Sequence, residues 1–474
     1  MKVLLINPPS DSPQPIMSLG LAFLAAALEK NNIPVEVIDA WAEGLNFEAL
    51  EKRIALAEAG LIGITVMSPV YPIGIKVIQA ARRASPQSKI IIGGTHPSSL
   101  PEDCLTDSSE LDFVCCGEGD ELIVQLVNAL KGNGDVCDIK GLGCRREGRI
   151  VINGKAEPVR NLDDLPFPAR HLFPLSRYRT HPPYRLYNSY ATMITSRGCP
   201  FQCTYCTKSV SGQYFRFQST ERVIREIEFL KNKYNIKQIH FYDDDFTINK
   251  KRVEGLCDEI ISRGLKIAWS CVTRVDLVDE MLLRKMRKSG CWLISYGVES
   301  GNQRILDSVR KGYKVEQIKE AFTLTRNAGI RTLGYFMSGF PGETTETLND
   351  TVKLSFEIDP DFVSWSILAL YPGSKLYQQA LQGELGNNYV QAQMPITEGK
   401  ANISSLSPYA HGHMYIYEGD ISRDYILQTV NKAYRRFYFR LTFLFRFLMR
   451  LRTFTEAFSY VKTLIQYLTW SKKE

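Results

Sequence analysis

Three cysteines lie close together near the middle of the chain, in the string T-S-R-G-C-P-F-Q-C-T-Y-C-T. Their spacing, Cys199-x-x-x-Cys203-x-x-Cys206, offers three thiolates, whereas a closed iron–sulfur cubane uses four. A cubane held by such a triplet keeps one iron without a protein ligand, and an open metal position can bind a substrate or cofactor. The triplet therefore predicts a catalytic iron–sulfur site.

Other interpretations of the triplet explain it less well. Two of the cysteines could form a disulfide, or the three could bind zinc with a distant fourth ligand. Zinc sites usually show paired C-x-x-C spacing, or C-x-x-C with histidines. Buried thiols that only pack are common, but here the cysteines alternate with Gly, Pro, Gln and Thr. A [4Fe-4S] cluster is the favoured interpretation.

The cysteine string closely resembles the signature of the radical SAM enzymes. In that family the open iron chelates the amino and carboxylate groups of S-adenosylmethionine, and reduction yields a 5′-deoxyadenosyl radical. The resemblance implies that Cys199, Cys203 and Cys206 ligate the cluster and that Tyr205 lies near the adenine. A thiolate-ligated cluster can be tuned to the low potential that this reduction needs.

Length and composition indicate a multidomain globular protein. A chain of 474 residues is expected to form two or three domains, and 44% hydrophobic and 23% charged residues are ordinary values. The other eight cysteines show no disulfide framework and are interpreted as buried free thiols of a cytoplasmic protein. The short apolar run at the N-terminus predicts a strand rather than a secretory signal.

The first 130 residues alternate strand and helix patterns. Apolar strands separated by segments of helix length predict a doubly wound parallel sheet, with strands expected at 2–7, 35–39, 61–66, 89–92 and 113–119. Such sheets bind ligands at the carboxyl ends of their strands. Turns rich in Gly, Pro and Ser fall at those ends, at 7–9, 68–69, 93–97 and 117–119.

In their order, these turns resemble the cobalamin-binding domain that precedes many radical SAM domains. The resemblance implies a set of cobalamin-binding residues, namely Leu19, Gly20, Ser68, Gly93, Gly94, His96, Gly117 and Glu118. Methyltransferase-type cobalamin domains carry D-x-H-x-x-G, whose histidine ligates cobalt, but no Asp-x-His occurs in this sequence. Cobalt is therefore expected to lack that ligand, and His96 is interpreted as a turn residue near the cofactor.

The pattern divides the chain into four segments. We expect a Rossmann-like cobalamin-binding domain at 1–130, a linker at 131–190, a partial (β/α)6 barrel at 191–385 and a helical C-terminal extension at 386–474. The aromatic residues of the linker favour a segment wrapped around the barrel over a mobile hinge. In such barrels the chemistry gathers at the C-terminal ends of the strands.

Polar residues follow the expected barrel strands at those ends. The radical SAM resemblance implies that some of them bind S-adenosylmethionine, namely Asp243, Asp245, Arg274, Glu299, Ser300, Gly339 and Gly342. Arg274 suits a carboxylate because guanidinium pairs with it in a bidentate manner. Which acid of the run 243–245 faces the barrel mouth cannot be decided from the sequence, and a strand-end polar residue or a turn glycine explains each position almost as well.

The C-terminal region carries the basic excess of the chain. Residues 420–474 hold eleven Lys or Arg and four Asp or Glu. The difference between these counts, +7, equals the net charge of the whole chain. The arginines alternate with Phe, Leu and Tyr, and no apolar run reaches the length of a membrane span. Two interpretations are equally weighted: an amphipathic helix at the inner face of the membrane, and a helix that covers the barrel. Nucleic acid is not an expected partner.

Together these resemblances imply a cobalamin-dependent radical SAM enzyme, similar to the anaerobic magnesium-protoporphyrin ester cyclase and several carbon methylases. The expected reaction is hydrogen abstraction from an unactivated carbon, followed by methylation from methylcobalamin. The expected partners are a small-molecule substrate, with a hydrophobic or lipid-like molecule as one option, and an electron donor such as flavodoxin or ferredoxin.

Several alternatives remain open at this point. One is oxidative cyclisation or rearrangement, for instance of a tetrapyrrole-like substrate, with cobalamin as an electron carrier. Another is a radical enzyme whose first domain no longer binds cobalt, and a third is a non-catalytic iron–sulfur scaffold. A tRNA methylthiotransferase is disfavoured because residues 1–103 contain no cysteine for a second cluster.

Overall fold

The structure is a computed structural model in which the chain divides into two compact units. It describes residues 1–474 except 11, 13, 133, 179–181, 392–414, 418, 420, 442 and 444–474, and only the backbone of 137, 182, 391, 415 and 416. Unit 1 comprises Met1–Tyr178, Arg197–Phe217 and Ala369–Ile416, and unit 2 comprises Arg179–Ser196, Gln218–Leu368 and Tyr417–Glu474. The segment with the three cysteines therefore belongs to unit 1, together with the N-terminal residues.

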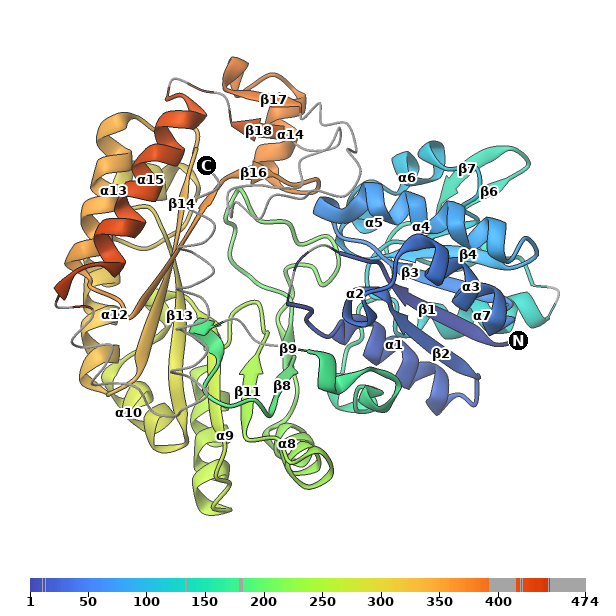
Figure 1. Cartoon of the computed structure of the whole chain (residues 1–474), viewed down its shortest axis with the longest axis horizontal. Helices are drawn as coiled ribbons and strands as arrows, with labels where there is room; N and C mark the ends of the chain where they lie inside the picture. Colours follow the sequence, from blue (N-terminus) through green and yellow to red (C-terminus); the bar gives the residue numbers. More distant parts are fainter. Residues whose placement is uncertain are drawn as a thin grey trace. The chain divides into compact units, whose positions relative to one another are not determined.

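Unit 1 is built on a seven-stranded sheet in the order β2-β1-β3-β4-β5-β6-β7 (Figure 1). The strands are β1 (Val3–Asn7), β2 (Val35–Asp39), β3 (Leu61–Thr65), β4 (Lys89–Gly93), β5 (Phe113–Cys115), β6 (Leu142–Arg146) and β7 (Arg149–Ile152). The first five pair in parallel, whereas β6 and β7 are antiparallel. Apolar side chains of the parallel strands are buried, as a sheet covered on both faces requires. The predicted doubly wound sheet is confirmed.

Helices of unit 1 follow the strands and cover the sheet. They are α1 (Leu19–Lys30), α2 (Ala40–Glu43), α3 (Phe47–Ala57), α4 (Tyr71–Ala84), α5 (Thr95–Ser99), α6 (Pro101–Asp107) and α7 (Leu122–Lys131). A further helix of unit 1, α14 (Lys375–Leu381), belongs to the later segment. Helix α1 contacts α7 and helix α3 contacts α4. The strand order reverses between β1 and β3, and in this topology the ligand crevice lies at the carboxyl ends of those two strands. Met67, directly after β3, is 55% exposed there.

Part of the expected linker belongs to the sheet of unit 1. Strands β6 and β7 lie within 131–190, and they extend the sheet beyond β5 instead of leading away from it. Short alternating strands joined by Glu147-Gly148, both at positive φ, form this hairpin. The expectation that eight cysteines are free thiols holds for six, all buried: Cys104, Cys115, Cys116, Cys257, Cys271 and Cys291. It is wrong for Cys144, which is disulfide-bonded.

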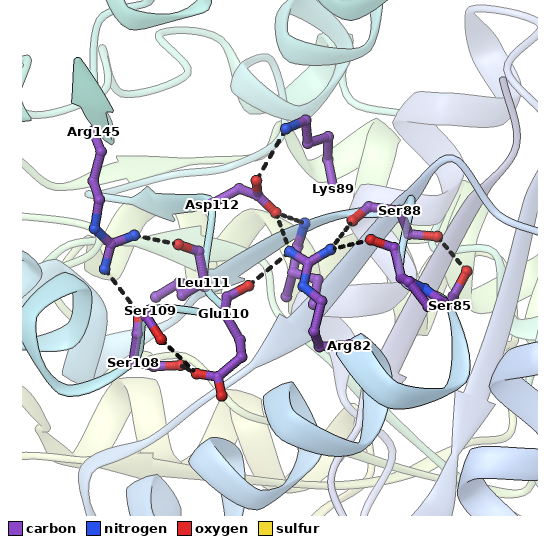
Figure 2. A network of polar contacts seen from close by, with 12 residues as sticks. Arg82, Ser85, Ser88, Lys89, Ser108, Ser109, Glu110, Leu111, Asp112 and Arg145 are labelled. Atoms are coloured by element: carbon purple, nitrogen blue, oxygen red, sulfur yellow. Dashed lines mark hydrogen bonds and ion pairs between the residues drawn. The ribbon is translucent and has the colours of Figure 1, made fainter. Parts of the chain in front are cut away.

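A polar network holds the amino ends of β4 and β5 (Figure 2). The guanidinium of Arg82 donates to the carbonyl oxygens of Ser88 and Glu110, each at 2.8 Å, and to Asp112 Oδ2 at 2.7 Å. Arg145 donates to the carbonyl oxygens of Leu111 at 2.6 Å and of Ser108 at 2.8 Å. These bonds fix the loops that enter the two strands.

We expect Arg82→Ala to lower the free energy of unfolding of unit 1 by about 2–3 kcal/mol, because several carbonyls and a carboxylate lose a charged donor. Arg83→Ala is the matched control, since that side chain is 62% exposed and, among the described residues, pairs only with Glu51. Urea unfolding followed by circular dichroism measures both variants. Equal small losses would contradict a structural role for Arg82.

Unit 2 contains a six-stranded parallel sheet in the order β15-β14-β13-β12-β11-β8. The strands are β8 (Tyr190–Met193), β11 (Gln238–Phe241), β12 (Ala268–Thr273), β13 (Cys291–Glu299), β14 (Arg331–Ser338) and β15 (Phe362–Ile367). They alternate with α8 (Thr220–Tyr234), α9 (Lys250–Ser262), α10 (Glu280–Lys288), α11 (Gln303–Ser308), α12 (Val315–Asn327) and α13 (Thr345–Glu357) (Figure 1). The sheet does not close, because no pairing joins β8 to β15. This is the predicted partial (β/α)6 barrel.

The segment before β8 closes the amino-terminal end of the barrel. Leu186 packs with the buried Trp292, Leu293, Leu333 and Phe362 at the starts of β13, β14 and β15. The amide nitrogens of Leu186 and Tyr187 donate to Gln238 Oε1 at 2.9 and 3.0 Å. The hydroxyl of Tyr184 contacts those of Tyr335 and Ser295. The end of the expected linker is therefore a plug under the barrel, which leaves the carboxyl ends of the strands for ligands.

Helix α15 (Arg423–Tyr438), drawn in red in Figure 1, covers the open edge strand β15. Its Tyr434 hydroxyl accepts a hydrogen bond from the Trp365 amide at 2.7 Å, and its Tyr438 hydroxyl bonds with the amide and carbonyl of Val363, each at 3.1 Å. Arg440 pairs with Asp359 at 2.9 Å and lies over Phe437. The first part of the basic tail thus agrees with the barrel-covering interpretation. Arg446, Arg450 and Arg452 lie outside the described residues, so membrane binding stays a prediction.

We expect Tyr434→Phe to destabilise unit 2 by about 1–3 kcal/mol, because the Trp365 amide at a buried strand edge loses its acceptor. Tyr425→Phe is the matched control, since Tyr425 is 38% exposed on the same helix. Differential scanning calorimetry measures the shift. A Tyr434→Phe protein that melts with the control would show that water replaces the hydroxyl.

A further three-stranded sheet contains β16 (Ala369–Leu370), β17 (Tyr389–Gln391) and β18 (Tyr415–Tyr417). A two-stranded sheet, β9 (Ser196–Arg197) with β10 (Arg216–Phe217), joins the two ends of the cysteine segment. Among the helices that the structure describes, none has the length and hydropathy needed to span a membrane.

Candidate active site

The cysteine segment is a closed loop between β9 and β10. The Cys199 amide donates to the carbonyl oxygen of Gly212 at 3.4 Å, and the Cys206 amide donates to that of Cys203 at 3.2 Å. Gly198 has a φ of +84°, and a Cβ there would overlap the carbonyl oxygen of Tyr214. The backbone before the first cysteine therefore requires glycine.

The exposure of these three thiols differs from that of the free thiols elsewhere in the described residues. Cys199 and Cys203 are half-buried and Cys206 is exposed, whereas the other six free cysteines are buried. Burial raises the pKa of Cys116, for example, to about 11, which keeps that thiol protonated and inert. The loop thus holds the accessible soft ligands in one place.

A cubane fits this donor set better than a single ion does. Within the described part of the chain, no three His, Cys, Asp or Glu side chains gather into a group that could hold one metal ion. A cubane is ligated at separate iron atoms, so its thiolates lie further apart than the ligands of one ion. Three accessible, disulfide-free cysteines on one short loop suit that arrangement.

The predicted cobalamin residues of β3 and β4 meet at the carboxyl end of the sheet. Gly94, at a φ of +115°, packs directly on Val66, where a Cβ would lie 2.5 Å from the carbonyl oxygen. Gly93 lies beside Cys115. His96 is fully buried, with its Nδ1 3.1 Å from Ser68 Oγ and its ring 4.0 Å from that of Tyr71. His96 therefore lies in helix α5 and not in a turn as expected, and its position near the cofactor stays a prediction.

The remaining predicted cobalamin residues lie in two places. Leu19 and Gly20 begin α1, where Leu19 is buried and Gly20 exposed with open space at its Cβ position. Gly117 and Glu118 follow β5, and Gly117 has a φ of +108°. The Glu118 carboxylate is buried in ion pairs with Arg197 and Arg216 of the cysteine loop. The glycine turns after β4 and β5 and the exposed Met67 after β3 lie at the carboxyl ends of the strands, where such sheets bind their ligands, so they fit a large ligand such as cobalamin.

Of the predicted S-adenosylmethionine residues, Asp243 anchors the backbone of the barrel. Its carboxylate accepts hydrogen bonds from the Thr195 amide and hydroxyl, each at 2.6 Å, and from Ser196 Oγ at 2.7 Å. Arg252 lies 3.7 Å away. These bonds fix the residues that lead from β8 into the cysteine loop. Asp243 therefore holds the backbone of Thr195 and the side chains of Thr195 and Ser196 in place. A direct contact of Asp243 with S-adenosylmethionine stays a prediction.

The other charged residues of this group form a buried cluster at the ends of β11, β12 and β13. Glu299 pairs with Lys311 at 2.8 Å, and Asp245 accepts from Thr273 Oγ1 at 2.7 Å. Burial raises the pKa of Asp245 to about 6, although Thr273, Arg274 and Lys311 oppose that shift. Glu299 has a φ of +64°, a strained conformation for a residue with a Cβ.

Arg274 and Ser300 are held by neighbours in unit 2. Arg274 donates to both oxygens of Asp276, at 2.9 and 2.8 Å, and to the carbonyl oxygen of Lys311 at 2.7 Å. Ser300 is fully buried, and its Oγ lies 3.1 Å from Thr351 Oγ1. Tyr205, in the cysteine loop of unit 1, is half-buried. The roles of these residues toward the cofactor stay predictions.

The turn after β14 contains buried oxygen atoms that lack a hydrogen-bond partner among the described residues. Gly339 and Gly342 have φ of +87° and +73°, and the Gly339 amide donates to Glu343. Glu343 Oε1 and Ser338 Oγ are buried without a hydrogen-bond partner among the described residues. Burial raises the pKa of Glu343 to about 7. Buried polar atoms of this kind fit a ligand that carries donors, as the amino group and ribose of S-adenosylmethionine do.

Four residues of these sites were missed by sequence reasoning: Lys311, Arg197, Arg216 and Asp120. Arg197, Arg216 and Asp120 are buried by pairing between segments far apart along the chain, whereas Lys311 pairs with Glu299, twelve residues before it. Arg197 and Arg216 stand close to the cysteines in sequence, which was the one available signal.

Comparison with known proteins agrees with this geometry. The radical SAM superfamily model matches residues 193–355, and the B12 binding domain model matches residues 10–127. The chain is 32% identical over 392 residues to an uncharacterized methyltransferase of Pyrococcus horikoshii, which covers 81% of this chain and 84% of that protein. It is 27% identical over 431 residues to the anaerobic magnesium-protoporphyrin IX monomethyl ester cyclase of Rubrivivax gelatinosus, covering 90% of this chain and 74% of the relative.

Two solved structures share the fold. The radical S-adenosylmethionine methyltransferase TsrM of Kitasatospora setae has a TM-score of 0.72 at 20% identity, covering 91% of this chain and 88% of that one. The cobalamin-dependent S-adenosylmethionine radical enzyme OxsB has a TM-score of 0.74 at 18% identity, covering 100% of this chain and 71% of that one.

The chain belongs to the radical SAM superfamily, in the branch that carries a B12-binding domain. It is an enzyme, and its cofactors are a [4Fe-4S] cluster, S-adenosylmethionine and cobalamin. The interpretation as a non-catalytic iron–sulfur scaffold is thereby excluded.

Proposed function

We propose that this enzyme methylates an unactivated carbon of a small molecule. The observation that carries the proposal is the 32% identity to the Pyrococcus horikoshii methyltransferase, because the match spans 84% of that protein and includes both the cobalamin domain and the barrel. A likeness confined to the barrel would support radical chemistry alone. A chain that shares both domains with a methyltransferase has the parts for carrying and delivering a methyl group.

Different residues would hold the three cofactors, some from unit 1 and others from unit 2. When bound, the cluster and S-adenosylmethionine supply a radical that removes hydrogen, and cobalamin carries the methyl group. Cys199, Cys203 and Cys206 would hold the cluster, and the turns after β3, β4 and β5 would hold cobalamin. The buried group Glu299–Lys311, with Asp245, would orient the charged ends of S-adenosylmethionine. Tyr184 and Leu186, packed at the amino-terminal end of the barrel, would keep water out of that end.

Anaerobic reconstitution with iron, sulfide and cobalamin tests the proposal. The loaded enzyme, reduced with dithionite or with a flavodoxin, is given S-adenosylmethionine and candidate substrates. We expect both 5′-deoxyadenosine and S-adenosylhomocysteine, with methyl label recovered in a small-molecule product. Formation of 5′-deoxyadenosine with the methyl label left in methionine, and with neither S-adenosylhomocysteine nor a labelled product, would contradict methylation.

Oxidative cyclisation is the second candidate, favoured by the 27% identity over 90% of this chain to a magnesium-protoporphyrin ester cyclase. It predicts a tetrapyrrole-like substrate and 5′-deoxyadenosine without S-adenosylhomocysteine. The two candidates also differ in label, since only methylation transfers the methyl group of S-adenosylmethionine. A flavodoxin or ferredoxin as electron donor, and a hydrophobic or lipid-like substrate, are proposals tested by the same assay.

A further inference from the structure

Both ends of the cysteine loop are bound to the turn that follows β5 of the cobalamin domain. At the far end, Arg216 Nη2 donates to Glu118 Oε1 at 2.6 Å and Arg216 Nη1 donates to Glu118 Oε2 at 3.0 Å. The same guanidinium donates to the carbonyl oxygens of Val159 at 2.5 Å and of Ser211 at 3.2 Å. Guanidinium and carboxylate therefore meet in the bidentate geometry that restricts orientation most.

At the near end, Arg197 stands two residues before the first cysteine and binds the same turn. It donates to Asp120 through Nη1 at 2.7 Å and through Nη2 at 3.1 Å, and its Nη1 lies 3.3 Å from Glu118 Oε2. Its guanidinium also lies 5.2 Å from the centre of the Phe23 ring in α1. Two carboxylates two positions apart along the chain, those of Glu118 and Asp120, thus hold two arginines that flank all three cysteines.

This four-residue cluster, Glu118, Asp120, Arg197 and Arg216, is buried and electrically balanced. The side chains of Glu118 and Arg216 are 2% and 4% exposed, and those of Asp120 and Arg197 are 5% and 13% exposed. A buried ion pair gives little net stability, but removing one partner is strongly destabilising because the other charge is then uncompensated. The cluster therefore specifies where the loop lies more than it stabilises the fold.

The middle of the loop is tied to the same edge of the sheet. Ser209 Oγ donates to the carbonyl oxygen of Thr95, which follows β4, at 3.0 Å. The Leu376 amide of α14 donates to the carbonyl oxygen of Thr204, between two of the cysteines, at 2.9 Å. The loop is thus fixed at its ends and through Ser209 to the edge of the sheet where β4 and β5 end, and through Thr204 to helix α14.

We propose that Glu118 and Asp120 are positioning residues that hold the cluster loop on the cobalamin domain, with Arg197 and Arg216 as their partners. Glu118, which the sequence suggested as a contact of cobalamin, acts instead on the loop, because both of its oxygens already accept charged donors and Oε2 also accepts from the Val159 amide at 2.9 Å. The inference rests on family membership and holds whether the reaction is methylation or cyclisation.

Hydrogen–deuterium exchange of the full-length protein without cofactors tests the positioning directly. We expect Glu118→Gln to speed amide exchange in 197–217 by at least about tenfold, while β1 to β4 keep their protection. Glu121→Gln is the matched control, because that carboxylate is exposed three residues further along the same turn. Equal exchange of the loop in both variants would overturn the proposal.

The second readout is spectroscopic. After anaerobic reconstitution, we expect Glu118→Gln to retain less than half of the wild-type iron and to show an altered electron paramagnetic resonance spectrum of the reduced cluster. The double variant Glu118→Gln/Arg216→Gln removes both charges and is expected to recover loop protection and iron partly, because no uncompensated charge remains. If the double variant loses as much iron as the single variants Glu118→Gln and Arg216→Gln lose together, the ion-pair mechanism is contradicted.

Asp120→Asn keeps the test decisive if Glu118→Gln fails to fold. Its partner Arg197 is the most exposed member of the cluster, so water can compensate the charge and the domain should fold. We expect faster exchange at the start of the loop, around 197–199, with unchanged protection at 216–217. Unchanged exchange at both ends, with normal iron content, would overturn the proposal independently of any product assay.

Discussion

A Cys203→Ser variant, reconstituted without oxygen, is expected to hold no [4Fe-4S] cluster and to form 5′-deoxyadenosine at least about 100-fold more slowly than the wild type. Replacing residues that merely support a metal ligand typically costs 10–100-fold in affinity or activity, so removing a ligand should cost at least as much. Cys203 lies between the other two cysteines, and no further cysteine of the described residues stands in the loop to replace it. The same result is expected for Cys199 and Cys206.

Iron and sulfide content, the visible absorption of the cluster and the yield of 5′-deoxyadenosine measure this loss. Cys257→Ala is the control, because Cys257 is a buried thiol in α9 of unit 2. That variant should lose some stability and keep its iron. A Cys203→Ser protein with wild-type iron and turnover would refute the assignment of the cluster site.

Lys311→Met is expected to have the second largest effect. The Lys311 ammonium lies 2.8 Å from Glu299 in a buried site. Its removal leaves the buried Glu299 carboxylate without a counter-charge and should therefore lower the free energy of unfolding by about 3–5 kcal/mol. Binding of S-adenosylmethionine should also be lost, because Glu299 and Asp245 would no longer have the cation that balances them.

The double variant Glu299→Gln/Lys311→Met separates stability from binding. Removing both charges should restore most of the lost free energy of unfolding, since neither group is left uncompensated. Binding of S-adenosylmethionine to the cluster-loaded protein, measured by isothermal titration, should stay absent. If the double variant binds as the wild type does, Glu299 has only a structural role. Urea unfolding of the same samples supplies the control for folding.

Most of the architecture could be predicted from the sequence because it depends on local periodicity. The runs V-L-L-I-N and L-I-G-I-T form β1 and β3, and the alternation of such runs with helical segments leads to parallel sheets in both units. Strand ends shifted by a residue or more: the segment expected at 113–119 is a strand only over Phe113–Cys115. The turn that follows it is held by side chains of the cysteine loop, which periodicity does not reveal.

The functions of individual polar residues were harder to predict, because a strand end brings many polar side chains together. Asp243, Arg274 and Ser300 all lie at the ends of barrel strands, as expected, yet each is hydrogen-bonded to its own unit. Glu118 was placed at the correct edge of the sheet, but its partners are arginines of the cysteine loop. Lys311 lies twelve residues beyond Glu299, and its spacing gave no sign that it is buried.

The sequence by itself determined the soft ligands, the parallel strands of both units and the class of chemistry, since ligand type and hydrophobic period are properties of short segments. Only the tertiary structure decided which charges pair, that the loop with the cysteines packs on the cobalamin domain, and that the linker plugs the barrel. The physical reason is that an ion pair or a buried contact depends on distance in space, and residues such as Glu118 and Arg216 become neighbours only when segments far apart in the chain fold together.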